Sequence, residues 1–343
     1  MSVAVKFDNV SIVFGDAPET ALPLMDEGKS REEVSEATGQ VLGVHDCSIE
    51  VGESEILVLM GLSGSGKSTL LRAVNGLNPV TRGEVLVSDG DALVSVSGAS
   101  RAELRRIRLN RVAMVFQQFG LLPWRSVADN VGLGLELAGL GKHERAAKVT
   151  QQLELVGLDG WEDYKVSELS GGMQQRVGLA RAFATDAPIL LMDEPFSALD
   201  PLIRARLQDE LIELQGRLKK TIIFVSHDLD EAFKLGDRIA IMEGGRVVQI
   251  GTPRDIFAAP ANEYVADFVA HMNPLGVLRA EDVMAPIEGN EGDARQIAAD
   301  ASVQEAMQAL TAGEKLLRVM QDGAEVGRIT REDVLAKLLD PRE

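Results

Sequence analysis

The sequence contains little cysteine and no long apolar run. Its 343 residues include a single cysteine, Cys47, so no internal disulfide can form, which agrees with a reducing compartment. No apolar stretch approaches the roughly 18 residues that a membrane-spanning helix needs. The N-terminus has no signal-peptide layout, since Asp8 and Asn9 interrupt any apolar core. These absences predict a cytoplasmic protein in which Cys47, part of an alternating apolar stretch, packs in the core.

The chain is also poor in basic residues. Lys and Arg number 35 against 53 Asp and Glu, which gives a net charge of −18. Non-specific nucleic-acid binding needs a basic surface, so this balance argues against a nucleic-acid partner. The negative net charge does not exclude a membrane-bound protein as partner. The length allows two or three domains at roughly 100–200 residues each.

One stretch has the pattern G-x-x-x-x-G-K-S, with an apolar run before it and a helical pattern after it. Such a loop places backbone N–H groups around an anion at the positive end of a helix dipole. Its lysine would reach the β- and γ-phosphates of a nucleoside triphosphate, and the serine after it would be a ligand of Mg²⁺. The alternative is a chance glycine-rich turn. The residues are Gly61, Leu62, Ser63, Gly64, Ser65, Gly66, Lys67, Ser68 and Thr69.

Short, nearly continuous apolar runs alternate with helical patterns along the chain. Strands of this kind are typical of a mostly parallel sheet covered on both faces. The carboxyl ends of such strands meet at one edge, where ligands bind. We therefore expect an α/β fold with its site at that edge. The residues found at the ends of these runs are Gly61, Gln117, Asp193 and His227.

The N-terminal part has a different pattern. Residues 3–14 predict two strands with a turn at Asp8 and Asn9, ending at Phe14, which could stack on a nucleotide base or pack in the core. Residues 16–40 predict a helical insertion, since Ser30 and Glu33 form a capping-box pattern and Gly39 is a stop signal. The strand pattern resumes at residues 41–51.

Residues 169–176, Leu-Ser-Gly-Gly-Met-Gln-Gln-Arg, resemble the LSGGQ signature of the ATP-binding subunits of ABC transporters, with Met173 in place of the usual Gln. The resemblance covers residues 3–268, and the phosphate loop, Gln117, the signature, Asp193-Glu194, residues 197–200 and His227 follow in family order. It implies a P-loop NTPase of ABC type with a mostly parallel core sheet, an antiparallel β subdomain and a helical subdomain.

The residue types in these motifs suit ATP hydrolysis with Mg²⁺. Asp193 is a hard oxygen ligand for the metal, directly or through water, and Glu194 would polarise the attacking water. Gln117 can contact the metal or the water, and His227 can hydrogen-bond the γ-phosphate. Taken singly, each of these residues has a structural explanation, and their shared place at strand ends makes the functional one stronger.

The resemblance also implies a dimer. Ser170, Gly171 and Gly172 open a helix and form a second anion-binding terminus. In the family, the signature of one subunit covers the triphosphate held by the other, so two ATP molecules join two head-to-tail copies. Phe14 falls at the adenine-stacking position, and Asp200 belongs with the nucleotide-binding residues.

Within the family the chain is most similar to the ATPases of osmoprotectant uptake, which serve importers of quaternary amines such as glycine betaine, choline or proline betaine. The insertion at residues 16–40 and the stretches 191–204 and 226–232 carry this resemblance. It implies a membrane permease as partner, a periplasmic or lipoprotein binding protein beyond it, and a place on the cytoplasmic face of the inner membrane. The permease would contact an apolar surface of Phe119, Leu121, Leu122, Pro123 and Trp124.

The tail differs from the rest of the chain. Residues 280–286 and 327–335 resemble the start and the end of one CBS motif, so we expect an ATPase domain at residues 1–272 and a small α+β CBS-like domain at residues 279–343. The tail has eight Lys or Arg and fourteen Asp or Glu, a net charge of 8 − 14 = −6. It is either a stabilising appendage or a regulatory module that pairs with its copy and tunes uptake to ionic strength, as in the family.

Three other functions remain open on the sequence alone. One is a soluble ABC ATPase of translation or DNA repair, although such proteins tend to fuse two cores or insert long coiled coils, and this chain has one core and neither addition. A second is an importer ATPase for a different small solute, because the solute never touches this subunit. A third, a nucleotide-responsive regulatory protein, rests only on the tail.

Overall fold

A computed structural model describes residues 2–117, 120–197, 199–270, 277–287 and 294–339. The chain divides into two compact units, Met1–Val248 and Gln249–Glu343. The predicted domain limits, residues 1–272 and 279–343, differ from this division because two helices before residue 270 group with the tail. Residues 271–276, which include the end of the predicted ATPase domain, lie outside the described residues.

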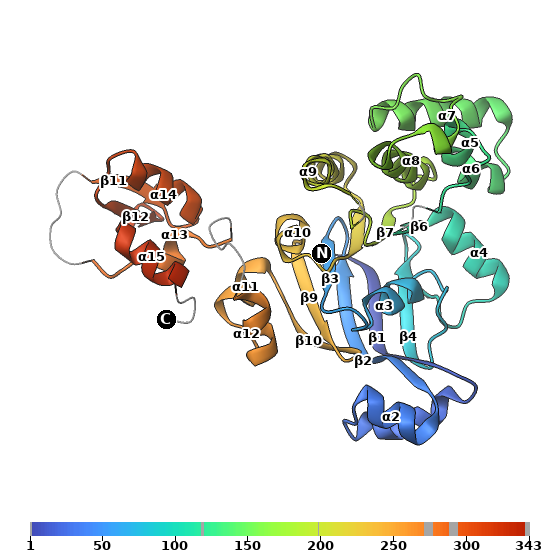
Figure 1. Ribbon diagram of the computed structural model, residues 1–343, viewed down its shortest axis with the longest axis horizontal. Helices are drawn as coiled ribbons and strands as arrows, with labels where there is room; N and C mark the ends of the chain where they lie inside the picture. The colour runs from blue at the N-terminus through green and yellow to red at the C-terminus, as the bar shows by residue number, and fades with distance from the viewer. Residues whose placement is uncertain (1, 118–119, 198, 271–276, 288–293, 340–343) are drawn as a thin grey trace. The chain divides into compact units, whose positions relative to one another are not determined.

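The core of the first unit is a six-stranded sheet with the order β10-β9-β3-β8-β7-β6 (Figure 1). Strands β3, β8, β9, β7 and β6 pair in parallel. Every residue of β3, β7 and β8 is buried, as the continuous apolar runs predict. The strands in chain order are β1 (Val3–Phe14), β2 (Val41–Gly52), β3 (Ile56–Met60), β4 (Arg82–Ser88), β5 (Leu93–Ser95), β6 (Val112–Val115), β7 (Ile189–Asp193), β8 (Thr221–Val225), β9 (Arg238–Glu243) and β10 (Arg246–Gly251), the last of which runs across the division between the units.

A second sheet, with the order β2-β1-β4-β5, is antiparallel. The predicted turn at Asp8 and Asn9 is wrong, because β1 runs unbroken through both residues. Asn9 has a left-handed φ of 49°, and the register of β1 against β2 shifts between Phe7 and Val10. Asn tolerates this conformation, so the polar pair marks an irregularity within one strand.

Helices cover the parallel sheet, and α5 to α8 lie together as a helical subdomain (Figure 1). Gly132 separates α5 from α6, and Gly139 and Gly141 lie between α6 and α7. Residues 18–21 and 166–168 form short 3₁₀ turns. The α-helices of this unit are α1 (Leu22–Asp26), α2 (Arg31–Thr38), α3 (Lys67–Ala73), α4 (Arg101–Asn110), α5 (Val127–Val131), α6 (Leu133–Leu137), α7 (Lys142–Leu155), α8 (Gly171–Ala184), α9 (Pro201–Leu218) and α10 (Leu229–Leu235).

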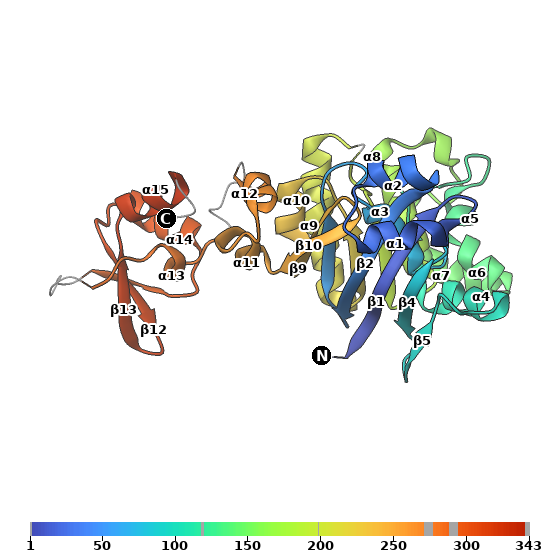
Figure 2. The same cartoon turned by 90° about the horizontal axis from the view of Figure 1, so that it is seen from below.

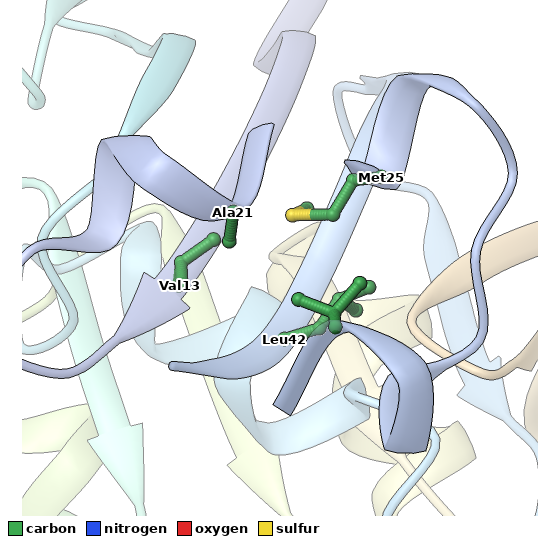
Figure 3. Packing of buried hydrophobic residues seen from close by; sticks show 5 residues of the cluster. Val13, Ala21, Met25 and Leu42 are labelled. Atoms are coloured by element: carbon green, nitrogen blue, oxygen red, sulfur yellow. The ribbon is translucent and has the colours of Figure 1, made fainter. Parts of the chain in front are cut away.

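The insertion between β1 and β2 is helical, as predicted. The capping box of α2 is present: the Ser30 hydroxyl accepts from the Glu33 amide at 3.2 Å, and the Glu33 carboxylate accepts from the Ser30 amide at 2.7 Å. Gly39 ends the helix with a φ of 67°. A cluster of five buried apolar residues joins the insertion to both strands, and the labelled side chains in Figure 3 point toward one another. We call it the insertion cluster; its members are Val13, Ala21, Met25, Val34 and Leu42.

Cys47 lies in β2 and is fully buried. Burial raises the pKa of its thiol to about 12, so the side chain stays neutral and acts as a small apolar group. The predicted packing role is confirmed.

The second unit contains a three-stranded sheet with the order β11-β12-β13, in which β11 and β12 are parallel and β12 and β13 antiparallel. Figure 2 shows it from a second direction. Among the described residues, no helix is long and apolar enough to cross a membrane. The elements are α11 (Pro253–Ala258), α12 (Glu263–Val269), α13 (Ala280–Val283), β11 (Arg295–Ala298), α14 (Val303–Thr311), β12 (Leu317–Gln321), β13 (Ala324–Ile329) and α15 (Arg331–Leu339).

Candidate nucleotide site

The phosphate loop connects β3 to α3 at the carboxyl edge of the parallel sheet. Two of its glycines are required by close packing. A Cβ on Gly61 would lie 2.1 Å from the carbonyl oxygen of Met242, and one on Gly66 would lie 2.6 Å from the carbonyl oxygen of Gly43. Both glycines also have positive φ values, 141° and 103°. These two positions therefore accept only glycine, which lets the loop fold closely against Met242 and Gly43.

Lys67 is 5% exposed and begins α3. Its ammonium donates to the carbonyl oxygens of Gly61 and Leu62 at 2.8 and 2.9 Å. Burial lowers the pKa of this ammonium, and the carboxylates of Glu194 and Asp193 oppose that shift. Carbonyl oxygens of the loop thus bind the Lys67 ammonium. Phosphate oxygens of a ligand on the loop could replace these carbonyls as its hydrogen-bond acceptors.

Asp193, the last residue of β7, is 2% exposed and accepts three hydrogen bonds. The Ser68 hydroxyl donates to its Oδ1 at 2.6 Å, and the Arg72 guanidinium donates to its Oδ2 from Nη2 at 2.8 Å and from Nε at 3.1 Å. The structure therefore brings together two predicted metal ligands, Ser68 and Asp193. Sequence reasoning missed Arg72, although its place four residues after Ser68 puts both on one face of α3.

The oxygens of Ser68 and Asp193 are hard ligands of the kind that Mg²⁺ prefers. Among the described residues, no group of three or more His, Cys, Asp or Glu side chains could hold a metal by itself. A Mg²⁺ ion held by one or two protein ligands takes its other ligands from phosphate and water. The Ser68 and Asp193 side chains therefore fit a Mg²⁺ ion that is bound together with a nucleotide.

Glu194 gathers the other two predicted catalytic residues around one carboxylate oxygen. The Gln117 amide nitrogen Nε2 donates to Glu194 Oε2 at 3.2 Å, and His227 Nδ1 lies 3.2 Å from the same oxygen. The backbone of Glu194 is left-handed, with a φ of 47°, and its amide donates to Val225 in β8 at 3.2 Å. A non-glycine residue in this region is strained by roughly 1–2 kcal/mol, so the fold holds Glu194 here against its preference.

A cavity of about 330 Å³ lies above the loop. This volume is in the range of small-molecule sites, which is roughly 300–1,000 Å³. Phe14, at the end of β1, is 39% exposed, which leaves a ring face open to a base. One residue of the insertion, Arg31, also reaches the cavity, and no motif singled it out. The lining residues are Phe14, Arg31, Val41, Leu42, Gly43, Ser63, Gly64, Ser65, Gly66, Lys67, Ser68, Thr69 and Glu194.

The signature residues do not line this cavity and form a second group with the start of α9. The Ser170 hydroxyl caps α8 by accepting from the Met173 amide at 3.4 Å, and Asp200 caps α9 by accepting from the Ile203 amide at 3.1 Å. A Cβ on Gly172 would lie 3.0 Å from Ile203, and Gly171 is exposed. The predicted nucleotide residues thus fall into two groups within one chain.

The predicted permease surface follows β6. Trp124 is 70% exposed, and Leu121 and Leu122 are half-buried. The buried Asn130 side chain holds this loop, accepting from the Leu122 amide at 2.7 Å and donating to its carbonyl at 3.1 Å. Phe119 lies outside the described residues, as does Ala198 in the motif at residues 197–200.

Residues 44–197 match the protein family described as ABC transporter. The chain is 50% identical over 283 residues to the glycine betaine/proline betaine transport system ATP-binding protein ProV of Escherichia coli, which covers 82% of this chain and 70% of ProV. It is 48% identical over 286 residues to the glycine betaine transport ATP-binding protein OpuAA of Bacillus subtilis, covering 83% of this chain and 68% of that protein.

A longer match extends through the tail. The trimethylamine N-oxide transport system ATP-binding protein TmoW of Ruegeria pomeroyi is 44% identical over 339 residues, or 98% of each chain. The dimeric structure of the bacterial ABC transporter cassette MJ0796 has a TM-score of 0.61 and 29% identity, covering 73% of this chain and 99% of that one. A post-hydrolysis MJ0796 dimer bound to ADP and Pi has the same TM-score, 30% identity and the same coverage.

The Arg72–Asp193 ion pair gives a prediction for stability. Arg72→Met removes two donors from an almost fully buried carboxylate, so we expect the free energy of unfolding to fall by about 1–3 kcal/mol. Urea denaturation of the nucleotide-free protein measures the change. Arg206→Met is the control, because its side chain is 72% exposed and pairs with Glu210 at 3.1 Å on the surface. We expect less than about 0.5 kcal/mol there, and equal losses in both variants would contradict the prediction.

Proposed function

This chain belongs to the ATP-binding subunits of ABC transporters, and we propose that it hydrolyses ATP to drive uptake of a glycine betaine-type osmolyte through a membrane permease. The observation that carries the proposal is the 50% identity to a glycine betaine/proline betaine transport ATPase across 82% of the chain. It favours import over a soluble ABC ATPase. In this role the protein works peripherally at the cytoplasmic face of the membrane, with Trp124 and its neighbours against the permease.

Trimethylamine N-oxide is a second candidate solute. The relative named for its transport matches 98% of this chain, tail included, whereas the betaine relatives match about four-fifths. Both solutes carry a methylated nitrogen and differ in their oxygen-bearing group. The solute contacts the permease and the binding protein, so no residue of this subunit distinguishes the two.

Uptake in reconstituted vesicles tests the proposal and separates the two solutes. The chain would be reconstituted with a permease and a binding protein of a quaternary-amine importer. ATP-dependent uptake of labelled glycine betaine, choline, trimethylamine N-oxide and spermidine would then be compared. We expect uptake of glycine betaine or trimethylamine N-oxide. Uptake of spermidine alone would assign the chain to an importer of a different solute.

We assign the chemistry to the side chains around the loop. The loop amides and Lys67 would bind the phosphates, and Phe14 would stack on the base. Ser68, Asp193 and Gln117 would hold Mg²⁺. Bound Mg²⁺ supplies charge neutralisation on the phosphates. Glu194 orients the attacking water and accepts its proton, and His227 donates a hydrogen bond to the γ-phosphate.

Replacing Glu194 separates binding from hydrolysis. In Glu194→Gln the phosphate loop is untouched, so ATP should bind normally, whereas turnover should fall by about 10²-fold or more because the proton-accepting group is lost. The matched variant is Lys67→Ala, which should weaken ATP binding itself. Titration calorimetry and a phosphate-release assay measure the two effects. Near-normal hydrolysis by Glu194→Gln would assign the water-orienting role to another residue.

We further propose that two copies form a head-to-tail dimer around two ATP molecules. The dimeric cassette of similar fold supports this, as does the placement of Ser170 and Asp200 away from the cavity that holds Lys67. In a lone chain, the exposed Ser170 and Gly171 of the signature have no phosphate to bind.

Mixed dimers test this arrangement. Lys67→Ala and Ser170→Arg subunits are each inactive alone, but a mixed dimer keeps one site whose loop and signature are both intact. We expect the mixture to recover ATPase activity that neither variant shows. A mixture no more active than its components would exclude the head-to-tail arrangement.

We also propose that residues 279–343 form a single CBS-like regulatory domain. The α-β-α-β-β-α order of its described elements supports this proposal. With a net charge of −6, the tail would be repelled by anionic lipid and attracted to a basic protein surface. Such contacts weaken as salt shortens the screening length below about 8 Å.

Truncation after Met272 should leave ATP hydrolysis and dimerisation intact and flatten the dependence of transport on salt inside the vesicle. The measurement compares full-length and truncated protein over a range of internal salt. If transport by the two proteins depended on internal salt in the same way, the tail would be a stabilising appendage and not a regulatory module.

A further inference from the structure

Arg31 belongs to the helical insertion but reaches the phosphate loop. Its Nη1 donates to the carbonyl oxygen of Gly64 in the loop, and its Nη2 donates to the carbonyl oxygen of Gly43 in β2 at 2.9 Å. One guanidinium therefore joins the insertion, the antiparallel sheet and the phosphate loop. The fork of N–H groups on arginine suits this, because two carbonyls at an angle can be bound at once.

The bond to Gly64 bears on the amides that would hold phosphate. A trans peptide is planar, so its C=O and N–H point in opposite directions. Fixing the Gly64 carbonyl against Arg31 therefore also fixes the N–H of Ser65, which donates to the Leu62 carbonyl at 3.1 Å within the loop. Arg31 thus restrains a peptide plane in the middle of the anion-binding turn.

The insertion that carries Arg31 is fixed to the rest of the fold by apolar packing and by hydrogen bonds. The insertion cluster packs it on β1 and β2 (Figure 3). The Asp26 carboxylate accepts from both terminal nitrogens of Arg82 at 2.7 Å and lies 2.9 Å from His45 Nε2. These hydrogen bonds from Arg82 and His45 hold the pKa of Asp26 well below its usual range, so it stays charged and paired at neutral pH. Arg246 adds a bond to the Met25 carbonyl at 2.9 Å.

Stability alone gives a poor reason for arginine at this position. Burial lowers the pKa of the Arg31 guanidinium, and its Nε is buried without an acceptor among the described residues. A buried donor without a partner lowers stability, and an apolar side chain of similar length avoids that penalty. Compared with such an apolar side chain, arginine adds the two hydrogen bonds to the carbonyls of Gly64 and Gly43, which line the cavity.

We propose that Arg31 is a positioning residue of the nucleotide site, which holds the phosphate loop in its phosphate-binding conformation and so makes affinity for ATP and ADP depend on the insertion. The inference rests on the proposed function of the loop. Because Arg31 acts through the loop amides, ATP and ADP should be affected alike.

The test uses the full chain with Arg31→Met, which keeps the length of the apolar stem and removes the guanidinium. We expect the dissociation constants of ATP and ADP, measured by titration calorimetry, to rise by about ten-fold each, the size expected for hydrogen bonds from a charged donor. In the nucleotide-free protein, amide hydrogen exchange across residues 62–70 should become faster, while the melting temperature stays within about 2 °C. Arg31→Lys, which can still reach one carbonyl, should lie between Arg31→Met and wild type.

Lys29→Met is the matched control, because it removes the same charge two residues away, where Lys29 pairs with Glu33 on the surface at 3.3 Å. It should bind both nucleotides as wild type does. Unchanged affinities in Arg31→Met would overturn the inference, as would a loss for ATP alone, which would indicate direct contact with the γ-phosphate. A falling melting temperature with unchanged loop exchange would make Arg31 a stabilising residue only. If the wild type itself binds no ATP, the proposed function fails, which is a separate result.

Discussion

The site depends on the register of three buried parallel strands. Leu59 of β3 and Asp193 of β7 both pair with Val225 of β8, so the three strands end side by side. The residues that follow, the phosphate loop, Glu194 and His227, must then meet at one edge. Every residue of these strands is buried, and a slip of one residue would turn each side chain to the other face. Packing of the core therefore sets the positions of the phosphate loop, Glu194 and His227, although the apolar residues of these strands are not themselves part of the site.

The charged groups of the site are stabilised by hydrogen bonds to the protein and not by contact with water. Lys67 and Asp193 are both almost fully buried, and each has its partners: loop carbonyls for the ammonium, Ser68 and Arg72 for the carboxylate. Leaving either charge unpaired in this environment would be strongly unfavourable. Each buried charge of the site is therefore matched by its own hydrogen-bond partners.

The insertion links the two sheets to the same site. It packs on the ends of β1 and β2, and these strands also provide Phe14 and Gly43 to the cavity wall. The antiparallel sheet with its helical insertion thus forms one side of the pocket, and the phosphate loop, which follows β3 of the parallel sheet, forms the other. The two sides are built from distant parts of the chain, and Arg31 is a side chain that touches both.

The sequence by itself determined the local elements and the chemistry of the loop. Continuous apolar runs predicted the parallel strands, and the capping box at Ser30 predicted α2, because these signals depend on neighbouring residues only. The same local reasoning placed a turn at Asn9, where strand pairing on both sides keeps β1 continuous. Only the tertiary structure decided that Arg31 and Arg72 contact the residues of this site. Arg31 lies 33 residues from Gly64 and Arg72 lies 121 residues from Asp193, and no periodic pattern records contacts of that separation. They arise from how the sheets and the insertion pack, which is a property of the whole fold.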